Sequence, residues 1–390
     1  MKELIIRLTV SFLIVVALLL VSCTPVATEE EAVEEEAHAP TTPTPEHQQE
    51  EVYYVLYPTG ESERYILPTF EELERERDGL ARNYPQTVKG VWEPGSAFAN
   101  RLIRKRLPEL RDVGVNTFHV LPHYFYVNDE LVLQSVLISA HQGKLVFLTG
   151  EKAEREYIDQ AVKAKKAGFA VSITPIYFGG PVEAVPDPDA FDEFALQQAR
   201  KWAQIAEEYQ VEYFSPFGEY EKHMSGQGLS KAALVERVNS WNRKALAEAR
   251  PIFKGKIVLK VSPIGLGSYS AQSASGYDIV AICFSIGRTA NPEEKYNWLP
   301  ESLQRNFSEA QAVAERDDVK WMVGDFGLPS EGCTEELRVE LSRIVFEEYK
   351  KTLKEEQKPV GFTFFAWEMP DGKVKDTEIV PFLKQFFSEI

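Results

Sequence analysis

The chain has 390 residues, 44% of them hydrophobic and 12% aromatic, and its formal net charge is −17. That composition is typical of a globular protein with a large core. The acidic balance argues against nucleic acid as a partner, because phosphate binding requires basic patches. The cysteines, Cys23, Cys283 and Cys333, show no zinc-ligand spacing, so we expect no metal site, and a Cys283–Cys333 bridge stays open.

The N-terminus has the pattern of a secretory signal. Lys2 and Arg7 precede an apolar run over 12–21, which is too short to be a confident membrane span. The run ends in Leu20-Val21-Ser22-Cys23, which resembles the bacterial lipobox. The resemblance implies cleavage before Cys23 and lipidation of Cys23, and hence a membrane-anchored protein facing outside the cytoplasm. An ordinary signal peptide or an uncleaved anchor is the alternative.

Residues 24–51 contain nine glutamates and no lysine or arginine. With so little apolar surface to bury, such a segment is expected to stay disordered, and charge repulsion with proline keeps it extended. We therefore expect three parts: a signal peptide over 1–23, an acidic linker over 24–51 and one folded domain over 52–390.

The folded part alternates strand-like and helix-like segments. A hairpin over 52–56 and 64–66 leads in, and an insertion carries strand-like pieces over 131–139 and 144–148. Strands are predicted over 87–92, 116–122, 169–176, 212–217, 256–261, 277–284, 319–323 and 360–365. Helices are predicted over 69–83, 99–113, 151–167, 188–209, 231–249, 299–316, 335–354 and 379–387.

Eight strand–helix units indicate a parallel sheet closed into a (β/α)8 TIM barrel, in the α/β class. An open doubly wound sheet is the alternative. However, Gly265-Leu266-Gly267 lacks a third glycine and a following helix, so it is no dinucleotide fingerprint, and there is no Walker motif. We expect no cofactor.

Function in such a barrel collects where strands end and the following loops begin. The predicted strand ends are rich in carboxylates and aromatic rings and poor in lysine and arginine. This mixture suits sugars, whose hydroxyls bond to carboxylates while their C–H faces stack on rings. The candidate residues are Trp92, His123, Tyr177, Glu219, Glu221, Asp325, Trp367 and Glu368.

Three strand ends carry a resemblance to a known group of enzymes. They read Ser215-Pro216-Phe217-Gly218-Glu219, Gly324-Asp325-Phe326-Gly327 and Phe364-Phe365-Ala366-Trp367-Glu368. In order and strand number they resemble the retaining (β/α)8 glycoside hydrolase clan. Within that clan, Lys89-Gly90-Val91-Trp92 and Gly114-Val115-Asn116 are most similar to a family of β-mannanases.

The resemblance implies a role for each matching position. Glu219 stands at the clan's general acid/base, Asp325 at its nucleophile and Trp367 at the tryptophan that lines the sugar site. Two departures weaken the match. Gly218 replaces an asparagine that binds the sugar 2-hydroxyl, and Asp325 is one methylene shorter than the usual glutamate. Asp325 can therefore be a nucleophile, a base for water or a relic.

The remaining candidates have weaker assignments. Glu221 is expected to hydrogen-bond substrate or to pair with Lys222 and His223. Trp92, Tyr177, His123 and Glu368 are candidate sugar contacts, and Trp92, Tyr177 and His123 also fit structural roles.

Three functions follow from these features. The leading one is a surface-anchored glycoside hydrolase with two catalytic carboxylates. The second is a catalytically inactive barrel that binds glycan. The third is a solute-binding lipoprotein, against which eight strand–helix units in one run argue.

Overall fold

A computed structural model describes residues 52–56, 62–93, 99, 102–127, 130–138, 145–177, 185, 187–264, 266–286, 296–328, 333–367 and 373–390. All of these lie in one compact unit, Glu50–Ile390. The expected signal peptide with Cys23, almost all of the acidic linker and the candidate Glu368 lie outside the described residues and stay predictions.

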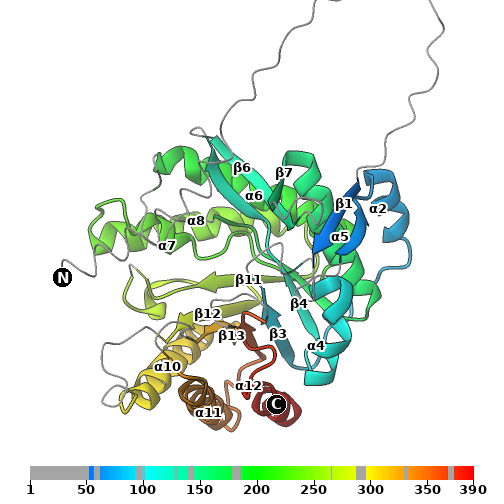
Figure 1. The fold of residues 1–390 in the computed structure, drawn as a ribbon. Coiled ribbons are helices and arrows are strands. Elements are labelled where there is room, and N and C mark those ends of the chain that lie inside the picture. The colour runs from blue at the N-terminus through cyan, green and yellow to red at the C-terminus, as the bar shows by residue number, and fades with distance from the viewer. Residues whose placement is uncertain are drawn as a thin grey trace, which may run out of the picture. The chain divides into compact units, whose positions relative to one another are not determined.

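Eight parallel strands close into a barrel, which confirms the predicted (β/α)8 architecture (Figure 1). In barrel order they are β3 (Val88–Trp92), β4 (Thr117–Val120), β8 (Ala170–Ile173), β10 (Tyr213–Phe214), β11 (Lys256–Val261), β12 (Ile279–Ser285), β13 (Lys320–Gly327) and β14 (Gly361–Phe365). Strand β14 pairs with β3 and thereby closes the sheet.

Helices surround the barrel. The longer ones are α5 (Gly150–Lys166), α6 (Pro188–Glu208), α8 (Lys231–Ala249), α10 (Leu299–Asp317), α11 (Glu335–Thr352) and α12 (Ile379–Glu389). Shorter ones are α2 (Phe70–Arg77), the π-helical turn η1 (Leu102–Arg106), α4 (Leu107–Val113), α7 (Tyr220–Met224) and the 3-10 turn η2 (Tyr269–Ala271). None of the helices in the described ranges is long and apolar enough to cross a membrane.

Helix α2 is shorter than the predicted 69–83. It begins as expected, because Thr69 and Glu72 form a reciprocal capping box. It ends at Arg77, because Asp78 is extended and Gly79 has φ +84°, a left-handed conformation that favours glycine. The predicted end at Asn83 was therefore wrong.

A second sheet extends from the barrel. It contains β7 (Leu145–Thr149), β6 (Glu130–Ile138), β5 (His123–Val127) and β9 (Ile176–Tyr177), in that order. Strands β4 and β8 pair inside the barrel, and their continuations β5 and β9 pair in this sheet. The continuous strands predicted over 116–122 and 169–176 are thus each interrupted, near Pro122 and Pro175, which have no N–H to donate. The leading hairpin, β1 (Val52–Leu56) with β2 (Ser62–Ile66), is confirmed.

The barrel side chains form two distinct environments. Outward residues such as Phe362 and Trp321 join the large apolar core with the helices. Inside, the end nearest the strand starts is apolar, with Val88, Tyr213 and Met322 among its members. Further up, the interior is polar, lined by Thr117, His119, Ser172, Thr174, Ser215 and Lys260. This polar layer departs from the branched aliphatic layers usual in such barrels.

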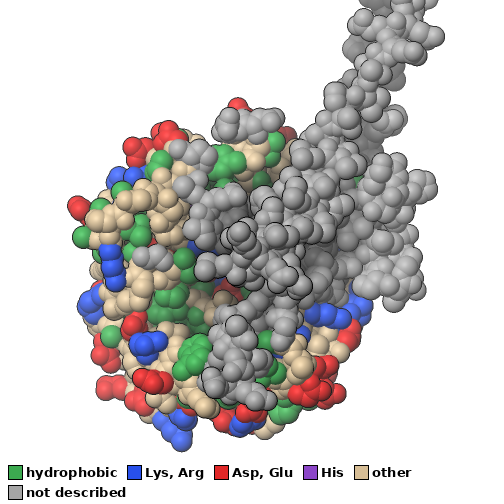
Figure 2. Space-filling view, turned by 60° about the vertical axis from the view of Figure 1, so that its left-hand side comes forward, with side chains coloured by type: hydrophobic (Ala, Val, Ile, Leu, Met, Phe, Trp, Pro, Cys, Tyr) green, Lys and Arg blue, Asp and Glu red, His purple; other side chains and the backbone are tan. Residues whose placement is uncertain are grey.

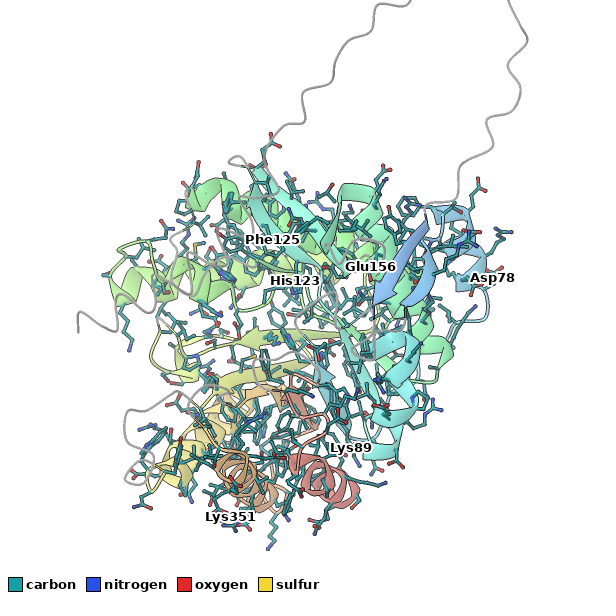
Figure 3. All side chains as sticks on the ribbon, viewed as in Figure 1. Asp78, Lys89, His123, Phe125, Glu156 and Lys351 are labelled. Atoms are coloured by element: carbon teal, nitrogen blue, oxygen red, sulfur yellow. The ribbon has the colours of Figure 1, made fainter. Side chains whose placement is uncertain are left out.

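Two features of the outer part of the domain are a hydrogen bond to the C-terminal helix and a mixed surface charge. Figure 3 places Lys89 beside the C-terminal helix, where its ammonium donates to the carbonyl of Phe387. Over the coloured part of the face in Figure 2, acidic and basic side chains are mixed and gather into no large area of one sign. Contact with a polyanion finds no support on that part of the face.

Candidate active site

A bulge in β13 positions Asp325. Val323 pairs with Ile282 of β12 and Asp325 pairs with Cys283, so Gly324 has no partner across this ladder. A Cβ on Gly324 would lie 2.7 Å from the Cβ of Ala281, so only glycine permits this approach of β12 and β13. Bulges re-aim side chains and are frequent beside active sites. The strand also runs on to Gly327, past the predicted end at 323.

The strand before Glu219 ends earlier than predicted. Strand β10 ends at Phe214, not at Phe217, so the prediction was wrong for its last three residues. Pro216 has no N–H for the sheet, and the N–H of Gly218 donates to Pro175 at 2.8 Å instead. This bond draws the segment toward the end of β8.

Glu219 starts helix α7 in a left-handed conformation, with φ +51° and ψ +43°. This region is uncommon for residues other than glycine, and such strain tends to occur at functional sites. Its side chain is 13% exposed, and one carboxylate oxygen lies 3.3 Å from the ammonium of Lys222. Glu219 is therefore partly buried but still reached by solvent.

Glu219 and Asp325 interact electrostatically. Burial raises the pKa of Asp325 from 3.8 to about 7, and the charge of Glu219 adds to the rise. The ammonium groups of Lys260 and Lys222 act in the opposite direction. The structure thus brings the two sequence-predicted carboxylates into one electrostatic environment, together with two lysines.

Glu221 is buried rather than open to substrate. It is 1% exposed, and its carboxylate accepts the backbone N–H of Ser262, just after β11. Burial, aided by the charge of Glu219, raises its pKa to about 8. Lys222 pairs with Glu219, and Glu221 has no ion-pair contact within the described part of the chain. Its assignment as a substrate contact stays a prediction.

The two candidate tryptophans at the strand ends are packed into the protein. Trp92 ends β3 and its ring stacks on that of His119, with centroids 6.0 Å apart. Trp367 is 3% exposed, and its backbone N–H donates to Glu93 at 2.9 Å. Its indole N–H has no hydrogen-bond partner among the residues the structure describes.

Tyr177 and His123 lie in the second sheet. Tyr177 packs edge-on against Tyr126 and His223, 5.4 and 5.0 Å away between centroids. His123, labelled in Figure 3, lies with Nδ1 3.3 Å from the hydroxyl of Tyr157, and burial lowers its pKa to about 4. Both side chains are buried, which fits the structural alternative noted for them, and their contact with sugar stays a prediction.

Sequence reasoning missed Lys260 and His119. Both are buried on the inner wall of the barrel and line a cavity of about 20 Å³. Burial and the charge of Lys260 lower the pKa of His119 to about 3, so its imidazole is neutral. A lysine inside the apolar run Lys256–Val261 was the signal that could have identified this site.

Cys283 and Cys333 are free thiols, so the bridge left open by the sequence does not form. Within the described ranges, no cluster of three or more His, Cys, Asp or Glu could hold a metal ion.

Solved structures share this fold. A GH113 β-1,4-mannanase superposes with TM-score 0.53 and 14% identity, over 78% of this chain and all of the mannanase. Thermotoga maritima Cel5A in complex with mannotriose gives TM-score 0.53 and 14% identity, over 81% and 99% of the two chains. The GH113 β-mannanase AaManA from Alicyclobacillus acidocaldarius gives 0.50 and 14%, over 80% and 98%. No protein-family model and no curated protein matches the sequence.

Proposed function

We propose that the domain hydrolyses glycosidic bonds of a poly- or oligosaccharide with Glu219 as general acid/base and Asp325 as nucleophile. One observation carries the proposal. Glu219 follows the fourth strand, Asp325 lies near the end of the seventh, the charge of Glu219 contributes to the raised pKa of Asp325, and a glycine bulge aims Asp325. Two carboxyl groups flanking the scissile bond are the machinery of glycoside hydrolysis.

The chemistry assigns opposite protonation states to the pair. Ionised Asp325 attacks the anomeric carbon while Glu219 donates its proton to the departing glycosidic oxygen. Water then attacks the glycosyl–Asp325 ester and passes its proton to Glu219, which frees the carboxylate of Asp325. The partial exposure of Glu219 supports exchange of this proton with solvent.

β-Mannan is the first substrate to test, because the similar structures include β-1,4-mannanases and a complex with mannotriose. The test measures release of reducing ends from mannan, glucan and galactan by the full chain. We expect activity on one of them, and a hundredfold to ten-thousandfold loss, roughly, in Glu219→Gln. No release by the wild type would contradict the proposal.

Azide identifies the role of each carboxylate. With Asp325→Ala, azide can take the place of the nucleophile and attack the substrate directly, giving a glycosyl azide of inverted configuration. With Glu219→Ala, azide should intercept the glycosyl–enzyme ester and give the retained configuration. Swapped products would exchange the two roles.

The second candidate is a glycan-binding barrel without catalysis, favoured by Gly218, which supplies no side chain for the sugar 2-hydroxyl. Calorimetry that detects binding of an oligosaccharide, with no turnover in the reducing-end test, would establish it.

We also propose that a lipid on Cys23 anchors the protein to the cell envelope, because Cys23 ends a lipobox-like sequence. Membrane fractionation tests this. The wild type should sediment with membranes, and Cys23→Ser should appear in the soluble fraction.

A further inference from the structure

Lys260 lies on the inner face of the barrel. In β11, Ile257, Leu259 and Val261 belong to the outer core, and Val258 and Lys260 alternate with them. Lys260 is only 4% exposed. A buried ammonium has lost its hydration, which costs several kcal/mol unless charges or polar groups in the protein compensate. Its surroundings should therefore contain the compensation.

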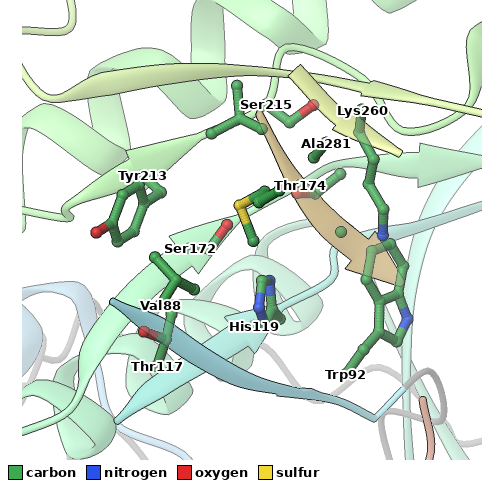
Figure 4. Close-up of a pocket in the computed structure, with 13 residues that line it drawn as sticks. Val88, Trp92, Thr117, His119, Ser172, Thr174, Tyr213, Ser215, Lys260 and Ala281 are labelled. Carbon is green, nitrogen blue, oxygen red and sulfur yellow. The ribbon is translucent and has the colours of Figure 1, made fainter. Parts of the chain in front are cut away.

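The compensation at Lys260 is incomplete. Its ammonium lies against the ring of Trp92, a cation–π contact (Figure 4). Within the described part of the chain, that ammonium has neither a hydrogen bond nor an ion pair. An aromatic ring stabilises an ammonium group less than a carboxylate does. A negative partner at longer range is therefore expected.

Asp325, a half-buried residue whose Oδ1 atom is buried, is the acid that fits. Its Oδ1 likewise lacks a hydrogen-bond partner among the described residues. Gly324, directly before it, lines the same small cavity as Lys260. About 20 Å³ is enough for one water, which could bridge polar groups there. Lys260 and the residue directly before Asp325 thus border one water-sized space inside the barrel.

Other charged or titratable groups face this site from the neighbouring elements. They are His119 on β4, Cys283 on β12, Lys222 and Glu221 on α7, and Glu219 immediately before it. His119 is neutral and burial keeps the Cys283 thiol protonated, because it raises the thiol pKa. Lys222 is already paired with Glu219. Among the residues that the structure describes, Lys260 is thus the cation left for Asp325.

We propose that Lys260 is the buried counter-charge of Asp325, a positioning residue that keeps this carboxylate ionised near neutral pH. Of the charges acting on Asp325, that of Lys260 has the largest effect, and it lowers the Asp325 pKa. The kinetic part of this proposal rests on the proposed function, and the electrostatic part does not.

The test titrates the Asp325 carboxyl by ¹³C NMR in the full chain, assigned by its loss in Asp325→Asn. Lys260→Met should raise the midpoint by about one unit or more, and Lys260→Arg should restore it. Lys256→Met is the matched control, because Lys256 is on the same strand but exposed and paired with Asp278. An unchanged midpoint in Lys260→Met would overturn the proposal.

Kinetics supply the second readout. If the midpoint moves from about 7 to about 8, kcat/KM of Lys260→Met at pH 7 falls about fivefold and recovers at pH 9. A midpoint shift without any glycan hydrolysis would contradict the proposed function and leave the ion pair established. Hydrolysis with an unchanged pH profile would refute the role of Lys260 alone.

A double-mutant cycle covers the case in which Lys260→Met folds poorly. Free energies of unfolding are compared for Lys260→Gln, Asp325→Asn and the double variant at pH 8. We expect Lys260→Gln to cost more stability in the presence of Asp325 than in its absence. Additive effects would count against the pair.

Discussion

Cys283 of β12 lies directly opposite Asp325 of β13, one step past the point at which Gly324 leaves the strand register. The extra residue changes where the Asp325 side chain begins. Asp325, which is shorter than the glutamate expected at this position, thus stands on a displaced backbone. The length of the side chain and the position of the backbone together determine where the carboxylate lies.

The bulge predicts that Asp325 cannot be exchanged for the longer acid. In Asp325→Glu the carboxylate would advance by one methylene on a backbone adjusted to aspartate, and misplacement by about 1 Å costs about a hundredfold. We expect kcat/KM to fall at least tenfold, and at least about a thousandfold in Asp325→Asn. Steady-state kinetics at pH 8 check this. Wild-type activity in Asp325→Glu would show that the bulge does not restrict which acid can act at this position.

The pH–rate profile should show an acidic limb near pH 7. In the proposed mechanism Asp325 must be ionised to attack, and burial raises its pKa to about 7. Activity therefore rises as the pH increases through 7. A nucleophile of ordinary pKa would be fully ionised by pH 6 and would give no such rise. A kcat/KM profile from pH 4 to 9 measures the limb. A midpoint near 4 would show that Asp325 does not limit the rate.

The contribution of Asp325 to folding stability should fall with increasing pH, whereas the activity rises. Because the folded-state pKa of Asp325 lies above its unfolded value of 3.8, the folded protein holds the proton more tightly, and stability is lost as pH rises from about 4 to 7. Asp325→Asn should therefore raise the free energy of unfolding on the order of a few kcal/mol at pH 8, and change it little at pH 4. Chemical unfolding at both pH values, with exposed Asp78→Asn as control, tests it. An equal gain at both values would mean that ionisation is not the cause.

The opposite end of the barrel should govern stability without affecting chemistry. Lys165 pairs with Glu212 at 2.6 Å, and both side chains are buried. Lys165→Met leaves the Glu212 charge without its partner and should cost about 3–5 kcal/mol. Lys166→Met is the matched control, because the neighbouring Lys166–Glu76 pair is half exposed and is worth about 0–1 kcal/mol. Thermal unfolding compares them. Equal losses would contradict the assigned difference.

The sequence was sufficient for the barrel because the strand and helix patterns are local. Helix 231–249 and strand 256–261 were predicted with the bounds that the structure has, since Ser230 caps the helix and the strand is a short, mostly apolar run. The strand breaks near Pro122 and Pro175 had a local signal in the prolines, but the second sheet that the continuations form is a tertiary feature that no local pattern specifies.

For the site, the sequence placed Glu219 after the fourth strand and Asp325 at the seventh, and the charge of Glu219 contributes to the raised pKa of Asp325. The left-handed start at Glu219 and the bulge at Gly324 could not be predicted, because both depend on neighbouring strands. Lys260 was missed for another reason. Residues at and after the strand ends were expected to carry the site, whereas Lys260 lies within β11, one residue before its end, and its side chain points into the barrel.

Gly218 has less freedom to change than its lack of a side chain suggests. A Cβ there would lie 3.0 Å from the Cγ2 methyl of Thr174, tighter than ordinary contact. Threonine is stiff at χ1, so it does not easily turn aside. We expect Gly218→Asn alone to lower the melting temperature and Thr174→Ser to relieve the loss. Differential scanning calorimetry of both single variants and the double tests this, and an unaltered melting temperature in Gly218→Asn would refute the clash.

That contact affects the order in which the two positions can change. An asparagine at 218 should be better tolerated once residue 174 has lost its methyl group, so the two positions are coupled. Libraries that vary position 218 alone would therefore sample a restricted set of outcomes.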